Sequence, residues 1–107
     1  MPKHARFYWG RRSGTNRYDF TWEEIHHDSV VVISASEGKP PITSNAPERF
    51  VGDAGFIVLN IAPRDGGVVF GVRIEWDQPI GLWTDITVFD RSDSLFQPRS
   101  RFVDIPG

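Results

Sequence analysis

The chain contains no cysteine, and this absence excludes several kinds of site. Without thiols there is no disulfide, no thiolate metal ligand and no cysteine nucleophile. The sequence also has no apolar run of about 18 residues, the length of a membrane-spanning helix. Its first 17 residues are basic and lack the apolar segment of a signal peptide. We therefore expect a soluble protein that is cytoplasmic or is released without a signal peptide.

Helical patterns are missing as well, whereas strand and turn residues are frequent. The chain has one methionine but eight prolines, ten glycines and 13% aromatic residues, a composition that favours short strands joined by tight turns. A chain of 107 residues forms one domain and buries about two thirds of its unfolded surface. The sequence therefore predicts a single all-β domain over residues 1–107.

Acidic residues are absent from the first 18 positions, although the net charge of the whole chain is -2. This segment holds five basic residues: Lys3, Arg6, Arg11, Arg12 and Arg17. All 14 acidic residues follow it, which argues against a broad nucleic-acid footprint. We expect a solvated basic loop, with contact to a phosphate as the alternative.

Three stretches of alternating apolar residues predict three consecutive antiparallel strands. They cover residues 56–61, 68–76 and 82–89, and the turn-forming segments 63–67 and 77–81 separate them. If Ile61 faces Val68 and Trp76 faces Leu82, one side of this sheet forms a core. The expected core residues are Ile57, Leu59, Ile61, Val68, Phe70, Val72, Ile74, Trp76, Leu82, Ile86 and Val88.

The opposite side of the same sheet, here called the mixed face, is the predicted binding surface. Gly71 should leave a shallow depression between Val58 and Thr87, and Arg73 should lie directly across from Asp85. Aromatic rings beside charged groups suit a sugar ring or a lipid head group. The predicted ligand-binding residues are Phe56, Gly71, Arg73, Glu75, Trp83 and Asp85.

The remaining strands are expected on both sides of these three. Residues 5–9 and 18–22 alternate and predict a hairpin whose long basic loop is 10–17. The β-branched run 30–33 predicts a strand buried on both sides, and residues 101–105 predict a short edge strand. Residues 37–54 are rich in proline and are expected to be irregular. Six or seven strands predict an antiparallel β-sandwich, with a small β-barrel as the alternative.

Two clusters carry residues that are used in catalysis or metal binding. His26, His27, Asp28 and Ser29 offer a base, a carboxylate and a hydroxyl, but neighbouring side chains of an extended segment point to opposite sides, so we predict a turn. Asp90 and Asp93 lie in a loop that could hold calcium but lacks the spacing of an EF-hand, so a solvated turn is predicted. We expect no metal and no cofactor.

The residues Glu75 to Gly81, with the pattern Trp76-Asp77-x-Pro79-x-Gly81, resemble a motif of the aegerolysins, small all-β proteins that bind membrane lipids. Tyr8-Trp9-Gly10 and Gly55-Phe56 are similar to two further family segments that fall in the same order, and the resemblance as a whole covers about half the chain. Both family cysteines and the tryptophan after the proline are absent. The resemblance implies a β-sandwich that recognises sphingolipid-type head groups, with Trp76, Asp77 and Trp83 as the first positions to examine.

Taken together, these patterns predict binding rather than catalysis. The expected partner is a membrane-lipid head group or a glycan on the mixed face, with contact at a membrane surface and no contact with nucleic acid. One alternative is a small β-barrel enzyme that uses His26 or His27 with Asp28. Another is an interaction subunit that forms homo-oligomers through the mixed face. A third interpretation is that a loop from residues 37–54 covers the mixed face and makes it ordinary core.

Overall fold

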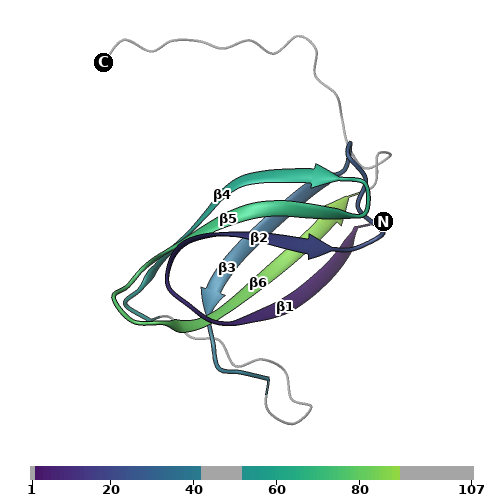
Figure 1. The fold of residues 1–107 in the computed structure, drawn as a ribbon. Helices are drawn as coiled ribbons and strands as arrows, with labels where there is room; N and C mark the ends of the chain where they lie inside the picture. Colours follow the sequence, from purple (N-terminus) through teal and green to yellow (C-terminus); the bar gives the residue numbers. More distant parts are fainter. Residues whose placement is uncertain (1, 42–51, 90–107) are drawn as a thin grey trace, which may run out of the picture.

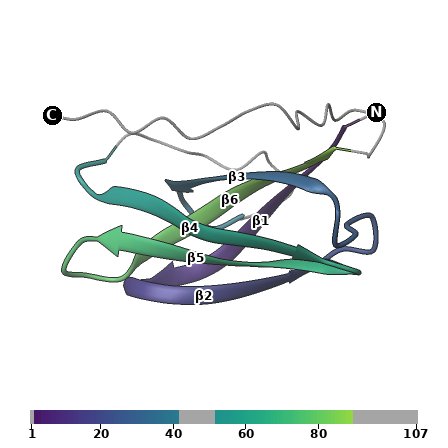
Figure 2. The ribbon, with the colours of Figure 1, turned by 90° about the horizontal axis from the view of Figure 1, so that it is seen from above.

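The computed structural model describes residues 2–41 and 52–89, which form two antiparallel sheets of three strands each (Figures 1 and 2). One sheet has the order β1-β6-β3 and the other the order β2-β5-β4. The strands are β1 (Lys3–Arg12), β2 (Gly14–Thr21), β3 (Val30–Glu37), β4 (Gly55–Arg64), β5 (Gly67–Glu75) and β6 (Ile80–Phe89). The predicted all-β sandwich is confirmed. The described residues contain no helix long and apolar enough to cross a membrane.

Three sequence predictions fall wholly or partly outside this region. They are the edge strand at residues 101–105, the loop with Asp90 and Asp93, and most of the irregular segment 37–54.

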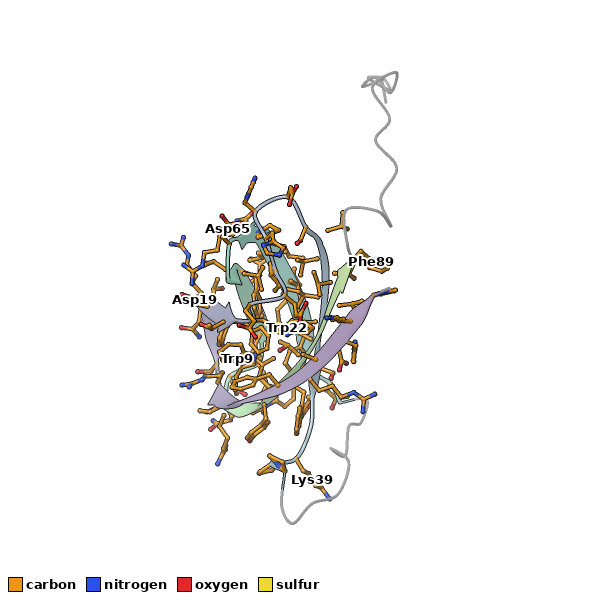
Figure 3. The ribbon with its side chains drawn as sticks, turned by 90° about the vertical axis from the view of Figure 1, so that its right-hand side faces the viewer. Trp9, Asp19, Trp22, Lys39, Asp65 and Phe89 are labelled. Carbon is orange, nitrogen blue, oxygen red and sulfur yellow. The ribbon has the colours of Figure 1, made fainter. Side chains whose placement is uncertain are left out.

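The core lies between the two sheets and is supplied by alternate positions of their strands. In β5 and β6 the buried positions agree with the sequence prediction: Val68, Phe70, Val72, Ile74, Leu82, Ile86 and Val88. Val31 and Ile33 of β3 and Tyr18 of β2 complete the facing layers. Figure 3 shows Trp9 and Trp22 in the space between the sheets, where they pack against this core.

The predicted pairing of the first two of the three consecutive strands is confirmed, since β4 pairs with β5. The pairing of the second with the third was wrong, because β5 and β6 belong to different sheets. β5 pairs with β2 and β4, and the connection 76–79 carries the chain across to the sheet in which β6 pairs with β1 and β3. Arg73 therefore faces Thr15 and Ile57, whereas Asp85 is bridged to Arg6 at 3.4 Å. The predicted pair Arg73 and Asp85 does not exist.

The predicted N-terminal hairpin was wrong for the same reason. β1 ends at Arg12, and the chain turns at Ser13 and Gly14, whose φ is +72°, into a strand of the other sheet. The basic residues 10–17 are thus mostly strand rather than a long loop. Strand length and alternation are the same in a hairpin and in a crossing between sheets, so the sequence pattern did not distinguish them.

The register of β4 differs from the prediction by one residue, which exchanges its two faces. A two-residue turn, Asp65-Gly66, joins β4 to β5 and sets Arg64 opposite Gly67. Phe56 and Val58 consequently pack against the core, while Ile57 and Leu59 lie on the outer face with Gly71 and Arg73. The exchange arises at a bulge between Leu59 and Ala62, which adds one residue to β4, and Ile61 in the bulge is exposed rather than core.

Two tryptophans exchange the environments expected for them. Trp76 follows the last residue of β5 and is 43% exposed, although it was predicted to be core. Trp83, predicted as an open platform, is 4% exposed. Its ring centroid lies 5.1 Å from that of Tyr8, and its indole N–H donates to the Lys39 carbonyl at 2.9 Å. The strand 30–33 is also buried on one side only, since Val30 and Val32 are exposed.

Candidate functional site

The six residues of the predicted binding surface do not share one face of the molecule. Gly71, Arg73 and Glu75 occupy the outer face of the β2-β5-β4 sheet. Trp83 and Asp85 occupy the outer face of the opposite sheet, and Phe56 packs against the core. The mixed face was therefore an incorrect grouping, and its aromatic platform is buried.

The histidine cluster forms the turn that the sequence predicted. The Ser29 backbone N–H donates to the His26 carbonyl at 3.0 Å, and the Ser29 hydroxyl accepts from the His26 N–H at 2.8 Å. His27 turns instead toward Asp65, its ring nitrogen 3.0 Å from the carboxylate. In the ranges 2–41 and 52–89, no group of three or more His, Asp or Glu residues could hold a metal ion.

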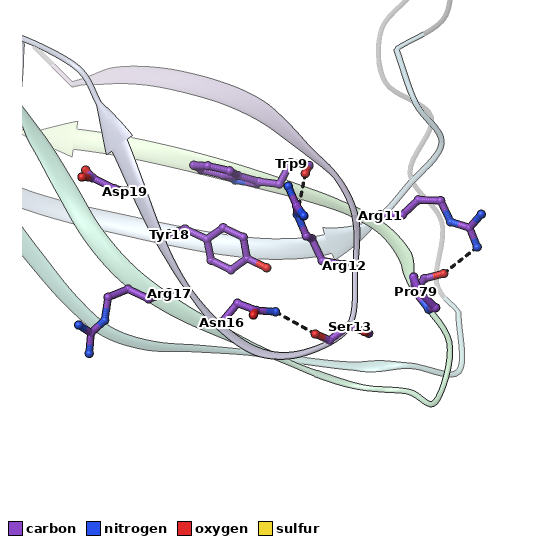
Figure 4. A pocket seen from close by; sticks show the side chains of 9 residues that line it. All are labelled: Trp9, Arg11, Arg12, Ser13, Asn16, Arg17, Tyr18, Asp19 and Pro79. Atoms are coloured by element: carbon purple, nitrogen blue, oxygen red, sulfur yellow. Dashed lines mark hydrogen bonds between the residues drawn. The ribbon is translucent and has the colours of Figure 1, made fainter.

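A hollow of about 470 Å³ lies beside β2, where the chain passes from one sheet to the other. We call it the cationic hollow, and Figure 4 shows its lining side chains. It is lined by Trp9, Arg11, Arg12, Ser13, Asn16, Arg17, Tyr18, Asp19 and Pro79. The predicted basic segment thus provides most of a concave wall rather than a solvated loop. A concave surface is the usual shape of a ligand-binding site.

The crossing between the sheets builds this wall. β1 and β2 are the adjoining edge strands of the two sheets, and only Ser13 separates them in the chain. The Asn16 amide donates to the Ser13 carbonyl at 2.8 Å, and Arg12 Nε donates to the Trp9 carbonyl at 3.0 Å. Arg11 donates to the Pro79 carbonyl at 3.0 Å and so attaches the corner to the connection that precedes β6.

Two aromatic rings form the inner wall of the cationic hollow, and core residues on their far side fix their positions. Trp9 and Tyr18 have ring centroids 5.0 Å apart. The Trp9 indole N–H donates at 2.8 Å to the hydroxyl of Thr84, a fully buried residue. Tyr18 stacks on Phe70, with centroids 5.8 Å apart and an angle of 26° between the rings. Both rings are therefore ordered before any ligand arrives.

The hollow carries three arginines and one aspartate, so its net charge is positive. No described carboxylate lies within 4.0 Å of the side-chain nitrogens of Arg11, Arg12 or Arg17. Asp19, the one acidic residue of the lining, forms an ion pair with Arg64. Guanidinium groups bind carboxylates and phosphates through two parallel hydrogen bonds, so the arrangement suits an anion.

The Tyr18 hydroxyl is the unusual polar group of the site. The residue is 6% exposed, and within the described part of the chain its oxygen has no hydrogen-bond partner. Burial raises the pKa of Tyr18 above its usual value, against smaller opposing effects of Asn16 and Arg12. The hydroxyl is therefore neutral at physiological pH and holds an unused donor, which costs about 1–3 kcal/mol while it stays unpaired.

A second hollow, of about 620 Å³, lies on the outer face of the β2-β5-β4 sheet, and we call it the apolar groove. It is lined by Thr15, Asn16, Arg17, Leu59, Asn60, Ala62, Val69, Phe70 and Gly71. The sequence predicted a depression at Gly71, and one is present. Its neighbours are Arg17 and Leu59 rather than Val58 and Thr87, because β2 and β4 flank this strand.

Comparison of the chain with protein-family models, with curated proteins and with solved structures found no match. The resemblance to the aegerolysins stays a prediction.

Proposed function

We propose that this protein is a non-catalytic binding protein whose ligand carries an anionic group and a flat or apolar group beside it. The cationic hollow is the site. The chemistry is that of a phospholipid head group or an acidic glycan. The observation that carries the proposal is that three arginines without carboxylate partners, among the described residues, line one hollow together with the aromatic residues Trp9 and Tyr18.

Each part of the lining has a physical role in this proposal. Arg12 and Arg17 bind the anion, since a guanidinium in a partly dehydrated hollow gains more from an anion than it does in water. Trp9 and Tyr18 offer ring surface to the adjoining part of the ligand. The unpaired Tyr18 hydroxyl gains a hydrogen bond if a small shift of Arg12 or Asn16 admits a ligand acceptor.

The lipid-binding expectation from the aegerolysin resemblance is part of this proposal. Pro79, from the motif that carries the resemblance, lines the cationic hollow, and its carbonyl accepts the hydrogen bond from Arg11. Trp83, the platform first expected, is buried and has no direct role in the proposed site.

The test uses phenyl phosphate as a probe, because it joins a phosphate to a flat ring. Isothermal titration calorimetry should show saturable binding to the wild-type protein and none to phenol at the same concentrations. Arg12→Gln and Arg17→Gln should each weaken phenyl phosphate binding about tenfold or more, that is by about 1.4 kcal/mol.

Arg73→Gln is the matched control, because Arg73 is an exposed arginine of the same sheet that lines neither hollow. It should leave the affinity for phenyl phosphate unchanged. Equal losses in Arg73→Gln and Arg17→Gln would indicate attraction by overall charge alone and would contradict a site at the cationic hollow. Failure of the wild-type protein to bind the probe would contradict it as well.

A further inference from the structure

The cationic hollow and the apolar groove share two lining residues, Asn16 and Arg17. Arg17 pairs with Gly71 across the ladder, so the groove begins directly beside the arginine. In Figure 4 the Arg17 side chain extends away from the Tyr18 ring, on the other side of β2. Because β2 is an edge strand, only its own width separates the two hollows.

The groove is shaped by backbone features rather than by chance gaps between side chains. Gly71 leaves its floor open, since a Cβ there would stand 3.4 Å from the Leu59 Cβ and 3.6 Å from the Asn16 carbonyl oxygen. The bulge in β4 places Asn60 at a φ of 48°, the one non-glycine residue with positive φ in the described ranges. Such conformations are costly and collect at functional sites.

Leu59, Ala62, Val69 and Gly71 form the apolar part of the groove, whereas Thr15, Asn16, Arg17 and Asn60 supply polar lining. A glycan placed over this apolar part would leave the hydroxyl groups that face it without hydrogen-bond partners, at a cost in affinity. An alkyl chain would lose only water. The positive end and the apolar end together fit a molecule that has one charged head and one hydrocarbon chain.

We propose that the ligand is a single-chain amphiphile with a phosphate head, of the lysophospholipid type. The phosphate binds Arg17 and Arg12, and the chain crosses β2 and lies over Gly71 between Leu59 and Val69. This inference rests on the proposed function, because it assigns the anion to the same arginines. It adds that the apolar groove holds the rest of the ligand.

The experiment measures the binding of butyl, hexyl, octyl and decyl phosphate to the wild-type protein below their micelle concentrations. Affinity should rise with chain length, by up to about fourfold per buried methylene, and reach a plateau when the groove is filled. Octanol, which lacks the charge, should bind at least tenfold more weakly than octyl phosphate.

Two variants assign the chain to the groove. Gly71→Val fills the floor, and Val69→Thr keeps the shape and strand propensity of Val69 but makes the floor polar. Both should retain the wild-type affinity for butyl phosphate and lose most of the gain from butyl to decyl phosphate. If Gly71→Val does not fold, Val69→Thr alone decides, and circular dichroism confirms the fold of each variant.

The failure of this inference is distinguishable from failure of the proposed function. Wild-type binding of phenyl phosphate and of all four alkyl phosphates with one common affinity would overturn the chain site and leave the anion site intact. A chain-length gain that survives in both groove variants would also overturn it. No binding of any phosphate would overturn both.

Discussion

At the scale of single residues, Trp76 and Trp83 each have the opposite burial from the one that alternation predicts. Alternation correctly assigns the even positions of β5 to the core as far as Ile74, but the strand ends at Glu75 and Trp76 lies in the connection between the sheets. Trp83 occupies a position of β6 that points away from the core. It is nevertheless buried, because the Tyr8 ring packs against it and its indole N–H donates to the Lys39 carbonyl. Alternation along a strand predicts which face of the sheet a side chain lies on. It does not predict whether other parts of the chain cover that face.

This difference predicts opposite effects of two identical substitutions. Trp83→Ala should lower the free energy of unfolding by about 3–5 kcal/mol, since it removes a buried ring and leaves the Lys39 carbonyl without its donor. Trp76→Ala should lower it by about 1 kcal/mol or less. Urea unfolding of the two variants checks both values. Equal losses would contradict the environments described for these residues.

Asp65 gives a prediction for the pH dependence of stability. It accepts hydrogen bonds from the backbone N–H of His27 at 2.9 Å and lies 3.0 Å from its ring nitrogen, and these contacts lower the pKa of Asp65 below its usual value. A carboxyl whose pKa is lower in the folded state stabilises the fold above its unfolded pKa, and this contribution is lost as the pH falls through the folded pKa.

The matched variant is Asp65→Asn, because Asn-Gly also forms the two-residue turn that Asp65-Gly66 makes. At neutral pH the wild-type protein should be the more stable of the two in urea. The difference should shrink as the pH is lowered through the acidic range below the usual pKa of 3.8. A difference that is constant from pH 7 to pH 2 would show that the carboxylate charge contributes nothing.

At the scale of elements, the sequence predicted where strands lie better than how they pair. The alternating stretches 68–76 and 82–89 correspond closely to β5 and β6, and their core residues were predicted correctly except for Trp76, which is exposed, and Trp83, which is buried. The two-residue turn Asp65-Gly66 shifts the register of β4 by two positions from the prediction, which leaves its faces unchanged near the turn. The bulge between Leu59 and Ala62, which the sequence did not predict, then adds one residue and exchanges Phe56 with Ile57.

The candidate site depends on the pairing of β2 with β5, which the sequence pattern did not predict. The arginines of the first 18 residues were visible as a charge cluster, and the depression at Gly71 followed from the absence of a side chain. The joining of these two features required the pairing of β2 with β5, which places Arg17 opposite Gly71. Long-range pairing of this kind is set by the packing of the sheets and not by local alternation.

At the scale of the whole molecule, the two sides of the sandwich differ in how the sheets meet. β3 and β4 lie against each other along one side of the sandwich. Along the other side no ladder joins β1 to β2 in the described chain, and the rings of Phe7, Trp9 and Phe20 make edge-to-face contacts there, with Phe7 41% exposed. The cationic hollow lies at the β1–β2 corner, beside these rings.

The positive charge collected at this corner should weaken the ligand-free fold, since neighbouring like charges repel one another. Arg17 has no hydrogen bond or ion pair within residues 2–41 and 52–89, whereas Arg64 of the same sheet is paired with Asp19. Arg17→Gln should therefore leave the free energy of unfolding unchanged or raise it by a few tenths of a kcal/mol at low salt. Arg64→Gln should lower it by up to about 1 kcal/mol.

Both differences should fade in about 1 M salt, where the screening length falls to about 3 Å. Urea unfolding of the three proteins at low and high salt measures these effects. A loss of stability in Arg17→Gln as large as that in Arg64→Gln would mean that Arg17 stabilises the fold itself. It would then not be a charge held free for a ligand, and its role in the cationic hollow would be structural. At low salt, a free energy of unfolding that falls in Arg64→Gln but not in Arg17→Gln distinguishes an arginine that holds two strands together from one that is available for binding.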